Sequence, residues 1–194
     1  MKTIWVATGN AHKLEEIGEI LGPGVQLKSF KDIANAPEVV ENGETYLANA
    51  EIKARALFGL VNEPVFADDS GLEVDALNGQ PGIHSARYSG PDTNHERNID
   101  KLLDELADVP ESKRTARFRC VIVYIDENGK SHKFEGVFPG QISFERSGKG
   151  GFGYDPIFFL PKHGCSVAEL QAEEKNRISH RGIAVKNLKD FLNL

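Results

Sequence analysis

The sequence has no apolar run long enough to cross a membrane. Its longest uninterrupted apolar stretch, Cys120–Ile125, is far below the roughly 18 residues that a membrane-spanning helix requires. The short apolar stretch at residues 4–7 runs directly into polar residues, which is not the pattern of a secretory signal. We therefore expect a cytoplasmic protein with no membrane partner.

The sequence is also poor in cysteine and has no excess of basic residues. Its two cysteines, Cys120 and Cys165, form no CxxC pair and no disulfide framework. The 23 lysines and arginines are outnumbered by 29 acidic residues, which gives a net charge of −6. This charge argues against broad nucleic-acid binding, so no nucleic-acid partner is expected. A small phosphorylated ligand remains compatible, because it needs only a few cations in one pocket.

The 194 residues are enough for about one domain, and their patterning mixes helices with strands. Residues 3–7 read as a buried strand, and a tight turn and a helix that stops at Gly22 follow. Further helices are predicted over residues 45–60, around 99–106 and from about 179 onwards, and further strands over 25–30, 65–67, 115–125 and 133–138. Crossover and hairpin connections together predict an α/β fold with a mixed sheet.

Two polar clusters lie in the first third of the chain. Thr8–Lys13 joins the first strand to the first helix, where free backbone N–H groups and a lysine can bind an anion. The alternative is an ordinary turn with a capping asparagine. Glu41 and Lys53 flank the start of the second helix, and a lysine there more often extends into solvent than binds a ligand.

The third cluster is Asp68-Asp69-Ser70-Gly71, predicted to follow a short buried strand. Two desolvated carboxylates repel each other unless a cation lies beside them, and oxygen ligands favour hard cations such as Mg²⁺. The alternative is a polar turn, since Asp and Ser are frequent turn residues.

Two further clusters lie near the C-terminus. Residues 148–153 contain a GxGxxG pattern, but Tyr-Asp-Pro-Ile-Phe-Phe follows and reads as a strand, so we reject a dinucleotide-binding interpretation. The glycines around Phe152 and Tyr154 would let aromatic rings reach a planar ligand, or would form a hairpin with core aromatics. Arg181 could read a carbonyl oxygen, and His180 alone would be a surface or capping residue.

Together these clusters resemble one family. The chain is similar to noncanonical purine nucleoside triphosphate pyrophosphatases of the inosine triphosphate pyrophosphatase, or Ham1, type. The motifs follow one another in the same order as in that family. The matching motifs are Thr8-Gly9-Asn10 with Lys13, Glu41 with Asn49-Ala50 and Lys53, Asp68-Asp69-Ser70-Gly71-Leu72, Pro81-Gly82 with Ser85-Ala86-Arg87-Tyr88, Phe152-Gly153-Tyr154-Asp155-Pro156, and Ser179-His180-Arg181-Gly182.

The resemblance implies hydrolysis of dITP, ITP and XTP to monophosphate and pyrophosphate, which removes damaged nucleotides. It implies an elongated mixed sheet flanked by helices, with residues 1–194 forming one domain of two lobes around a substrate cleft, and a homodimer. Phosphates would be held by Thr8, Gly9, Asn10, Ala11, His12, Lys13, Lys53 and Lys175. The base would be surrounded by Phe152, Gly153, Tyr154, Asp155, His180 and Arg181, with Ser70 touching substrate. Mg²⁺ would be held by Glu41 and Asp69, and Asp69 would be the general base.

Two other functions compete with this one. A related pyrophosphatase of the Maf type acts on pyrimidine nucleotides, but the Ser-His-Arg element at 179–181 speaks against it. A nucleotide-binding sensor without catalysis is disfavoured by the intact Asp68 and Asp69. A purely structural protein is least consistent, because polar clusters repeatedly interrupt well-formed core patterns.

Overall fold

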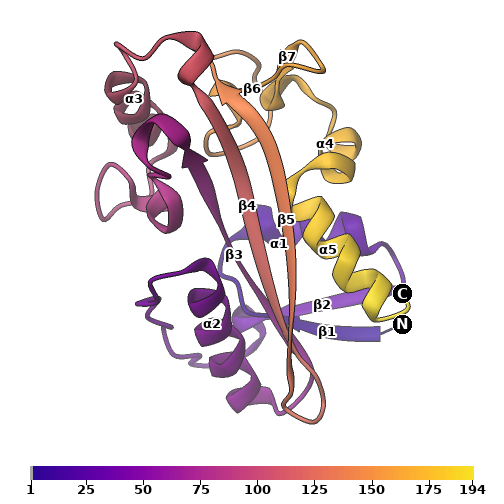
Figure 1. Cartoon of the computed structure of the whole chain (residues 1–194). Helices are drawn as coiled ribbons and strands as arrows, with labels where there is room; N and C mark the ends of the chain where they lie inside the picture. Colours follow the sequence, from indigo (N-terminus) through magenta and orange to yellow (C-terminus); the bar gives the residue numbers. More distant parts are fainter. Residues whose placement is uncertain (1) are drawn as a thin grey trace. The chain divides into compact units, whose positions relative to one another are not determined.

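The computed structural model describes residues 2–194. The α-helices are α1 (Ala11–Leu21), α2 (Tyr46–Val61), α3 (His95–Glu105), α4 (Ala172–Ile178) and α5 (His180–Phe191) (Figure 1). The strands are β1 (Lys2–Val6), β2 (Val25–Ser29), β3 (Val65–Val74), β4 (Thr115–Ile125), β5 (Ser131–Ile142), β6 (Phe158–Leu160) and β7 (Cys165–Ser166). Short 3₁₀ segments include η5 (Asp155–Ile157) and η6 (Val167–Glu169).

The strands form one mixed sheet in the order β2-β1-β3-β4-β5-β6-β7. Strand β1 is parallel to β2 and to β3, whereas β6 is antiparallel to β5 and to β7. Parallel neighbours need a crossover connection: α1 connects β1 to β2, and α2 connects β2 to β3, which lies on the other side of β1. The predicted α/β class with a mixed sheet is confirmed.

The first strand, turn and helix form as the local sequence predicts. Asn10 caps α1, because its backbone is extended and its side chain accepts a hydrogen bond from the Lys13 N–H at 3.2 Å. Gly22 ends the helix with φ +83°, a conformation that a residue with a Cβ rarely adopts. The turn between β1 and α1 is thereby fixed at the polar cluster Thr8–Lys13.

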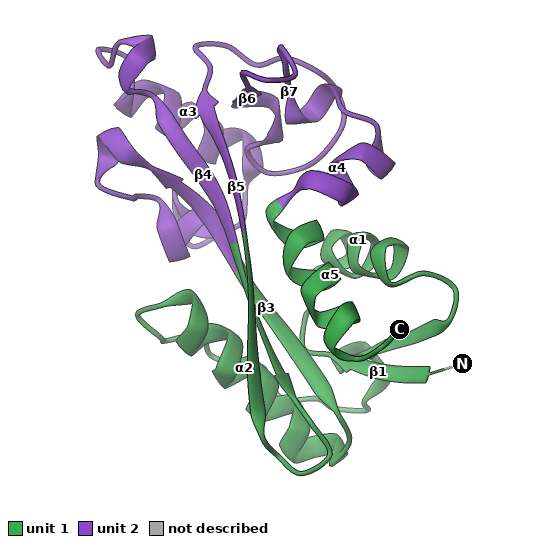
Figure 2. Ribbon diagram, turned by 45° about the vertical axis from the view of Figure 1, so that its right-hand side comes forward, with its two compact units in different colours: residues 1–69, 120–136, 180–194 green, residues 70–119, 137–179 purple. Residues whose placement is uncertain are grey.

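The chain divides into two compact units, which Figure 2 colours separately. Unit 1 comprises residues 1–69, 120–136 and 180–194, and unit 2 comprises residues 70–119 and 137–179. Strands β3, β4 and β5 each contribute residues to both units. That residues 1–194 act as one two-lobed domain stays a prediction.

Unit 1 has one hydrophobic core on each face of its part of the sheet. Alternate strand residues enter different cores, because successive side chains of a strand point to opposite faces. One core joins Phe66 of β3 to residues of α1 and α5, such as Ile17 and Val185. The other joins Val65 and Ala67 of β3 to residues of α2. This alternation determines where the residues that follow on β3 point.

Unit 2 has a single core built around α3 and the other ends of the long strands. Ile99 and Leu102 of α3 pack with Leu72 of β3, Phe118 of β4 and Phe158 of β6. The rings of Phe118 and Phe158 lie 4.5 Å apart between their centroids. Buried aromatic pairs of this kind stabilise a core beyond the area that they bury.

Three local predictions were wrong or incomplete. Strand β3 does not end at residue 67 but continues through Asp68–Gly71 to Val74, so this cluster is not a turn at a strand end. Helix α4 was not predicted. The predicted strand after Gly153 begins only at Phe158, because Asp155–Ile157 forms η5. Ser166 and Glu169 form a capping box at the start of the 3₁₀ segment η6.

None of the helices between residues 2 and 194 combines the length and hydrophobicity that a bilayer crossing demands.

The fold of unit 2 depends on a buried arginine that follows α3. The Arg114 guanidinium donates hydrogen bonds to three carbonyl oxygens, those of Leu106, Val109 and Ser143, at 2.6, 3.0 and 3.1 Å. Its side chain also lies over the Phe144 ring, 3.8 Å from the centroid. These contacts tie the C-terminal end of α3 to the end of β5.

We expect Arg114→Ala to lower the free energy of unfolding by about 3 kcal/mol, because it leaves buried carbonyl groups without a donor. Urea denaturation followed by circular dichroism measures the change. Lys113→Ala, next to it on the exposed surface, is the control and should unfold near the wild-type midpoint. Equal midpoints for both variants would show that Arg114 does not hold this end of the unit.

Candidate functional site

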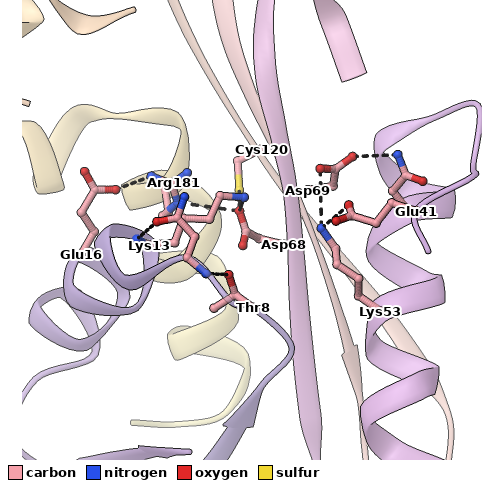
Figure 3. Close-up of polar contacts among 11 residues, drawn as sticks. Thr8, Lys13, Glu16, Glu41, Lys53, Asp68, Asp69, Cys120 and Arg181 are labelled. Atoms are coloured by element: carbon pink, nitrogen blue, oxygen red, sulfur yellow. Dashed lines mark hydrogen bonds and ion pairs between the residues drawn. The ribbon is translucent and has the colours of Figure 1, made fainter. Parts of the chain in front are cut away.

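The two neighbouring aspartates of β3 point to opposite faces of the sheet. Asp68 has the strand parity of Phe66 and reaches α1 and α5, whereas Asp69 has the parity of Ala67 and reaches α2 (Figure 3). Both are buried, with Asp68 only 1% exposed. The predicted repulsion between adjacent carboxylates is therefore reduced by separation, and each carboxylate has its own cationic partners.

Asp68 is held ionised by two cations. Its Oδ2 lies 2.7 Å from Lys13 Nζ of α1 and 3.8 Å from Arg181 Nε of α5. Burial alone would raise the pKa of this carboxyl, but the charges of Lys13, Arg181 and Lys53 outweigh it and hold the pKa well below its ordinary value. Asp68 is thus a permanent negative charge that fixes Lys13 and Arg181.

Arg181 and Cys120 complete this cluster. The Arg181 guanidinium also pairs with Glu16 of α1, so acidic and basic groups alternate from Glu16 through Arg181 and Asp68 to Lys13 (Figure 3). The Cys120 thiol lies 4.0 Å from Asp68 Oδ2, and burial together with that negative charge raises the thiol pKa to about 12. Cys120 is therefore a neutral packing residue and not a nucleophile.

The turn before α1 presents backbone and side-chain donors beside Lys13. Thr8 is buried, and its Oγ1 accepts a hydrogen bond from the Asn10 N–H at 3.1 Å. The rest of the predicted set in this turn is exposed: Gly9, Ala11 and His12. A helix N-terminus with a neighbouring ammonium group suits an anion such as phosphate.

On the other face of β3, one ammonium group joins two carboxylates. Lys53 Nζ of α2 lies 2.7 Å from Glu41 Oε2 and 3.7 Å from Asp69 Oδ1 (Figure 3). Lys53 is only 9% exposed, so the prediction that favoured a solvent-reaching lysine was wrong. The structure thus brings together three residues that are far apart in the sequence, as the resemblance implied for Glu41 and Asp69.

The pKa values on this face differ from those around Asp68. Burial raises the pKa of Asp69 above its ordinary value, although the charges of Lys53 and Lys13 partly oppose the shift. Burial lowers the pKa of Lys53, but the charges of Asp69, Asp68 and Glu41 more than reverse it. Asp69 therefore accepts a proton more readily than Asp68, which singles it out from its neighbour as a candidate base.

Unit 2 contains a separate cluster around Asp155. Its Oδ2 accepts hydrogen bonds from the Phe152 N–H and from Lys175 Nζ, both at 2.8 Å. Lys175 Nζ also lies over the half-buried Phe152 ring, 4.7 Å from the centroid. Gly151 has φ +74°, and a Cβ there would collide with the Asp155 side chain, so the loop requires glycine at this position.

The other predicted base-binding residues divide between the units. Tyr154 is buried in unit 2, and its hydroxyl donates to the Ser85 carbonyl at 2.8 Å. Gly153, with φ +64°, separates Phe152 from Tyr154. Ser70 is the partly buried first residue of unit 2 on β3. His180 and Arg181 are buried at the start of α5, in unit 1.

Two residues of these clusters were missed as site residues. Glu16 pairs with Arg181 across 165 positions of sequence, and Asn49 donates to Asp69 Oδ2 at 3.2 Å. Glu16 gave no local signal, because an acidic residue on the first helix reads as solvated surface. Asn49 did give one, since an amide on the apolar side of a helix must find partners when it is buried.

Comparison with known proteins agrees with the resemblance. The sequence profile of the Ham1 family matches residues 4–191. This chain belongs to the Ham1 family. Its Ham1 relatives include a dITP/XTP pyrophosphatase from Geobacillus kaustophilus, 49% identical over 97% of this chain and 93% of the relative. Another, from Shigella flexneri, carries the same name and is 47% identical over 99% of this chain and 98% of its own length.

Solved Ham1 structures share the fold along the whole chain. The Ham1 protein of Staphylococcus aureus superimposes with a TM-score of 0.89 at 40% identity and covers 99% of this chain and 98% of its own. The Ham1 protein of Coxiella burnetii gives a TM-score of 0.90 at 40% identity, covering 100% of this chain and 99% of its own.

The Asp68 cluster makes stability depend on acid pH. The pKa of Asp68 in the folded protein lies below its ordinary value of 3.8, so its ionised form stabilises the fold above that pH and the contribution is lost as the pH falls further. We expect Asp68→Asn to lower the free energy of unfolding at pH 7 by about 3 kcal/mol, because it leaves Arg181 and Lys13 with fewer counter-charges.

Urea unfolding at a series of pH values tests this expectation. The difference between wild type and Asp68→Asn should be constant above about pH 4 and should narrow below it. Asp92→Asn removes an aspartate side chain that is 84% exposed and should have little effect at any pH. A difference for Asp68→Asn that does not change with acidification would contradict the assignment.

Proposed function

We propose that this chain hydrolyses the noncanonical purine nucleoside triphosphates dITP, ITP and XTP to the monophosphate and pyrophosphate. The names of its Ham1 relatives support the substrate class. The observation that carries the chemistry is Lys53, whose single ammonium group lies between the carboxylates of Glu41 and Asp69. This arrangement supports the proposal that the two carboxylates, which come from different segments, share one cation.

The same pair fits a divalent ion, which we propose to be Mg²⁺. Glu41 and Asp69 offer only oxygen atoms, the donor type that Mg²⁺ prefers, and they already approach a common positive charge. Among residues 2–194 no group of three or more His, Cys, Asp or Glu side chains forms a closed metal cage. A site with two carboxylates leaves positions for water and substrate phosphate, as is usual for Mg²⁺ bound with nucleotides.

In the mechanism that we propose, water attacks the α-phosphorus and the bond to the pyrophosphate oxygen breaks. Asp69 orients the water and accepts its proton, a role favoured by the raised pKa of this carboxyl. The divalent ion, when bound by Glu41 and Asp69, would polarise the phosphate oxygens and favour loss of the proton from the water. The positive charges of Lys13, Lys53 and Lys175 offset the charge that develops on the leaving group.

The phosphates would also contact the turn formed by Thr8, Gly9, Asn10, Ala11 and His12. In unit 2 the Phe152 ring offers a stacking surface for a purine, and the Asp155 carboxylate accepts a hydrogen bond from the backbone N–H of Phe152. Gly153, Tyr154, His180, Arg181 and Ser70 complete the proposed substrate contacts. A hydrogen-bond donor aimed at O6 of the purine would favour keto-purines. It would disfavour adenine, because the amino group of adenine at this position would leave the donor unpaired.

Two further properties belong to the same proposal. A homodimer is the assembly that the family resemblance implies. The cytoplasm is the compartment we propose, in line with two free cysteines and no disulfide among residues 2–194.

Product analysis with dITP, ITP, XTP, ATP, GTP, UTP and dTTP tests the function. We expect pyrophosphate from the first three, a kcat/KM for ATP at least about 100-fold lower, and no turnover after EDTA treatment. Release of orthophosphate, or equal use of ATP, would refute the proposal. Preference for UTP and dTTP would instead favour a Maf-type activity, and nucleotide binding without turnover in the presence of Mg²⁺ would indicate a sensor.

Substitution of the candidate base is a second test. Asp69→Asn keeps the shape of the side chain but removes its basicity, so we expect normal folding and a kcat reduced about 10²- to 10⁴-fold. Pyrophosphate release from dITP, with circular dichroism as the folding control, measures both effects. Turnover retained within a few-fold of wild type would remove Asp69 from catalysis.

A further inference from the structure

Asn49 links the two proposed metal-binding carboxylates, yet it is not itself among the proposed substrate or metal contacts. It lies in the first turn of α2 and is 5% exposed. Asparagine is a poor helix former and its amide is costly to bury without partners, so a buried Asn in this position must be stabilised by specific hydrogen bonds. The oxygen and the nitrogen of its side-chain amide each form a hydrogen bond.

One end of the amide holds the loop that carries Glu41. Asn49 Oδ1 accepts a hydrogen bond from the Gly43 N–H at 2.8 Å, two residues after Glu41. A Cβ on Gly43 would lie 2.7 Å from Asn49 Oδ1 and 2.8 Å from the Ala48 Cβ. The loop can therefore approach α2 this closely only because residue 43 has no side chain, and Asn49 fixes it there.

The other end holds Asp69. Asn49 Nδ2 donates to Asp69 Oδ2 at 3.2 Å, whereas Lys53 lies on the side of the other oxygen, 3.7 Å from Oδ1. A carboxylate with one oxygen bound by an amide cannot rotate freely. Oδ1 is consequently kept on the side of Lys53, whose ammonium group also contacts Glu41.

We propose that Asn49 is a positioning residue that sets the distance and orientation of Glu41 relative to Asp69, and thereby the affinity of this pair for the divalent ion. The inference rests on the proposed function. Removal of a residue that orients metal ligands through hydrogen bonds typically lowers metal affinity or activity by about 10- to 100-fold. Asn49 is connected to both ligands, and each hydrogen bond constrains one of them.

Asn49→Leu, which removes both hydrogen bonds but keeps the branched side-chain skeleton, is the principal test. At a limiting Mg²⁺ concentration we expect the apparent kcat for dITP to fall about 10- to 100-fold while KM changes less than about threefold, because substrate contacts remain. Binding of Mn²⁺ to the nucleotide-free protein, followed by electron paramagnetic resonance, should weaken by about 10-fold or more. Asn49→Gln, which keeps the amide on a longer arm, should recover part of both losses.

Two variants of neighbouring residues separate positioning from simple loosening of the helix. Thr45→Ala removes the N-cap of the same helix, whose hydroxyl accepts from the Ala48 N–H at 3.1 Å, without touching Gly43 or Asp69. It should lower thermal stability but keep wild-type Mn²⁺ affinity and kcat. Gly43→Ala leaves Asn49 in place but forces the loop away, so it should reproduce the Asn49→Leu signature even if the latter folds poorly.

The outcomes distinguish this inference from the proposed function. Wild-type Mn²⁺ affinity in Asn49→Leu and Gly43→Ala, or equal losses in Thr45→Ala, would overturn the positioning role. If the wild type releases no pyrophosphate from any nucleotide, the proposed function fails. The Mn²⁺ titrations then still decide whether Asn49 organises the Glu41–Asp69 pair.

Discussion

The pleat of β3 is the constraint on which the two charged clusters depend. Because adjacent side chains leave a strand on opposite faces, Asp68 and Asp69 are neighbours in sequence but belong to different environments. Asp68 faces α1 and α5 and is matched by Lys13 and Arg181. Asp69 faces α2, where Glu41 adds a second negative charge beside Lys53. A shift of one residue in the register of β3 would exchange these environments and abolish both clusters.

The two environments give the two carboxyl groups different chemical roles. The charges of Lys13, Arg181 and Lys53 outweigh burial and lower the pKa of Asp68, so it holds cations and does not exchange protons under ordinary conditions. Burial beside Glu41 raises the pKa of Asp69, which makes it the more basic of the two. Paired titratable groups whose surroundings separate their pKa values are a common sign of divided catalytic roles. One strand thus supplies a structural anion and a candidate base.

Local sequence patterns predicted the elements that depend on neighbouring residues, and failed where tertiary contacts decide. The Asn10 cap, the end of α1 at Gly22 and the span of β4 could all be predicted from short stretches of sequence. The continuation of β3 through Asp68–Gly71 is not, because polar residues in a strand are tolerated only when partners from distant segments neutralise them. Lys53 on α2 can likewise be buried because Glu41 and Asp69, which come from other segments, balance its charge.

The candidate site could be predicted mainly through the family motifs. The resemblance of several short motifs to one family brought Glu41, Lys53 and Asp69 into one hypothesis, and Lys53 contacts both carboxylates in the structure. Within unit 1, however, Arg181 pairs with Glu16 and Asp68, a contact that no spacing rule indicates.

The three lysines assigned to phosphate binding already have acidic partners. Lys13 pairs with Asp68, Lys175 pairs with Asp155, and Lys53 lies near both Glu41 and Asp69. The Lys175–Asp155 pair is neutral, and so is the cluster in which Lys13 and Arg181 face Asp68 and Glu16. The Lys53 cluster keeps one negative charge in excess. A triphosphate would therefore meet no surplus of positive charge from these lysines alone, which is a physical reason for the pair Glu41 and Asp69 to recruit a divalent cation.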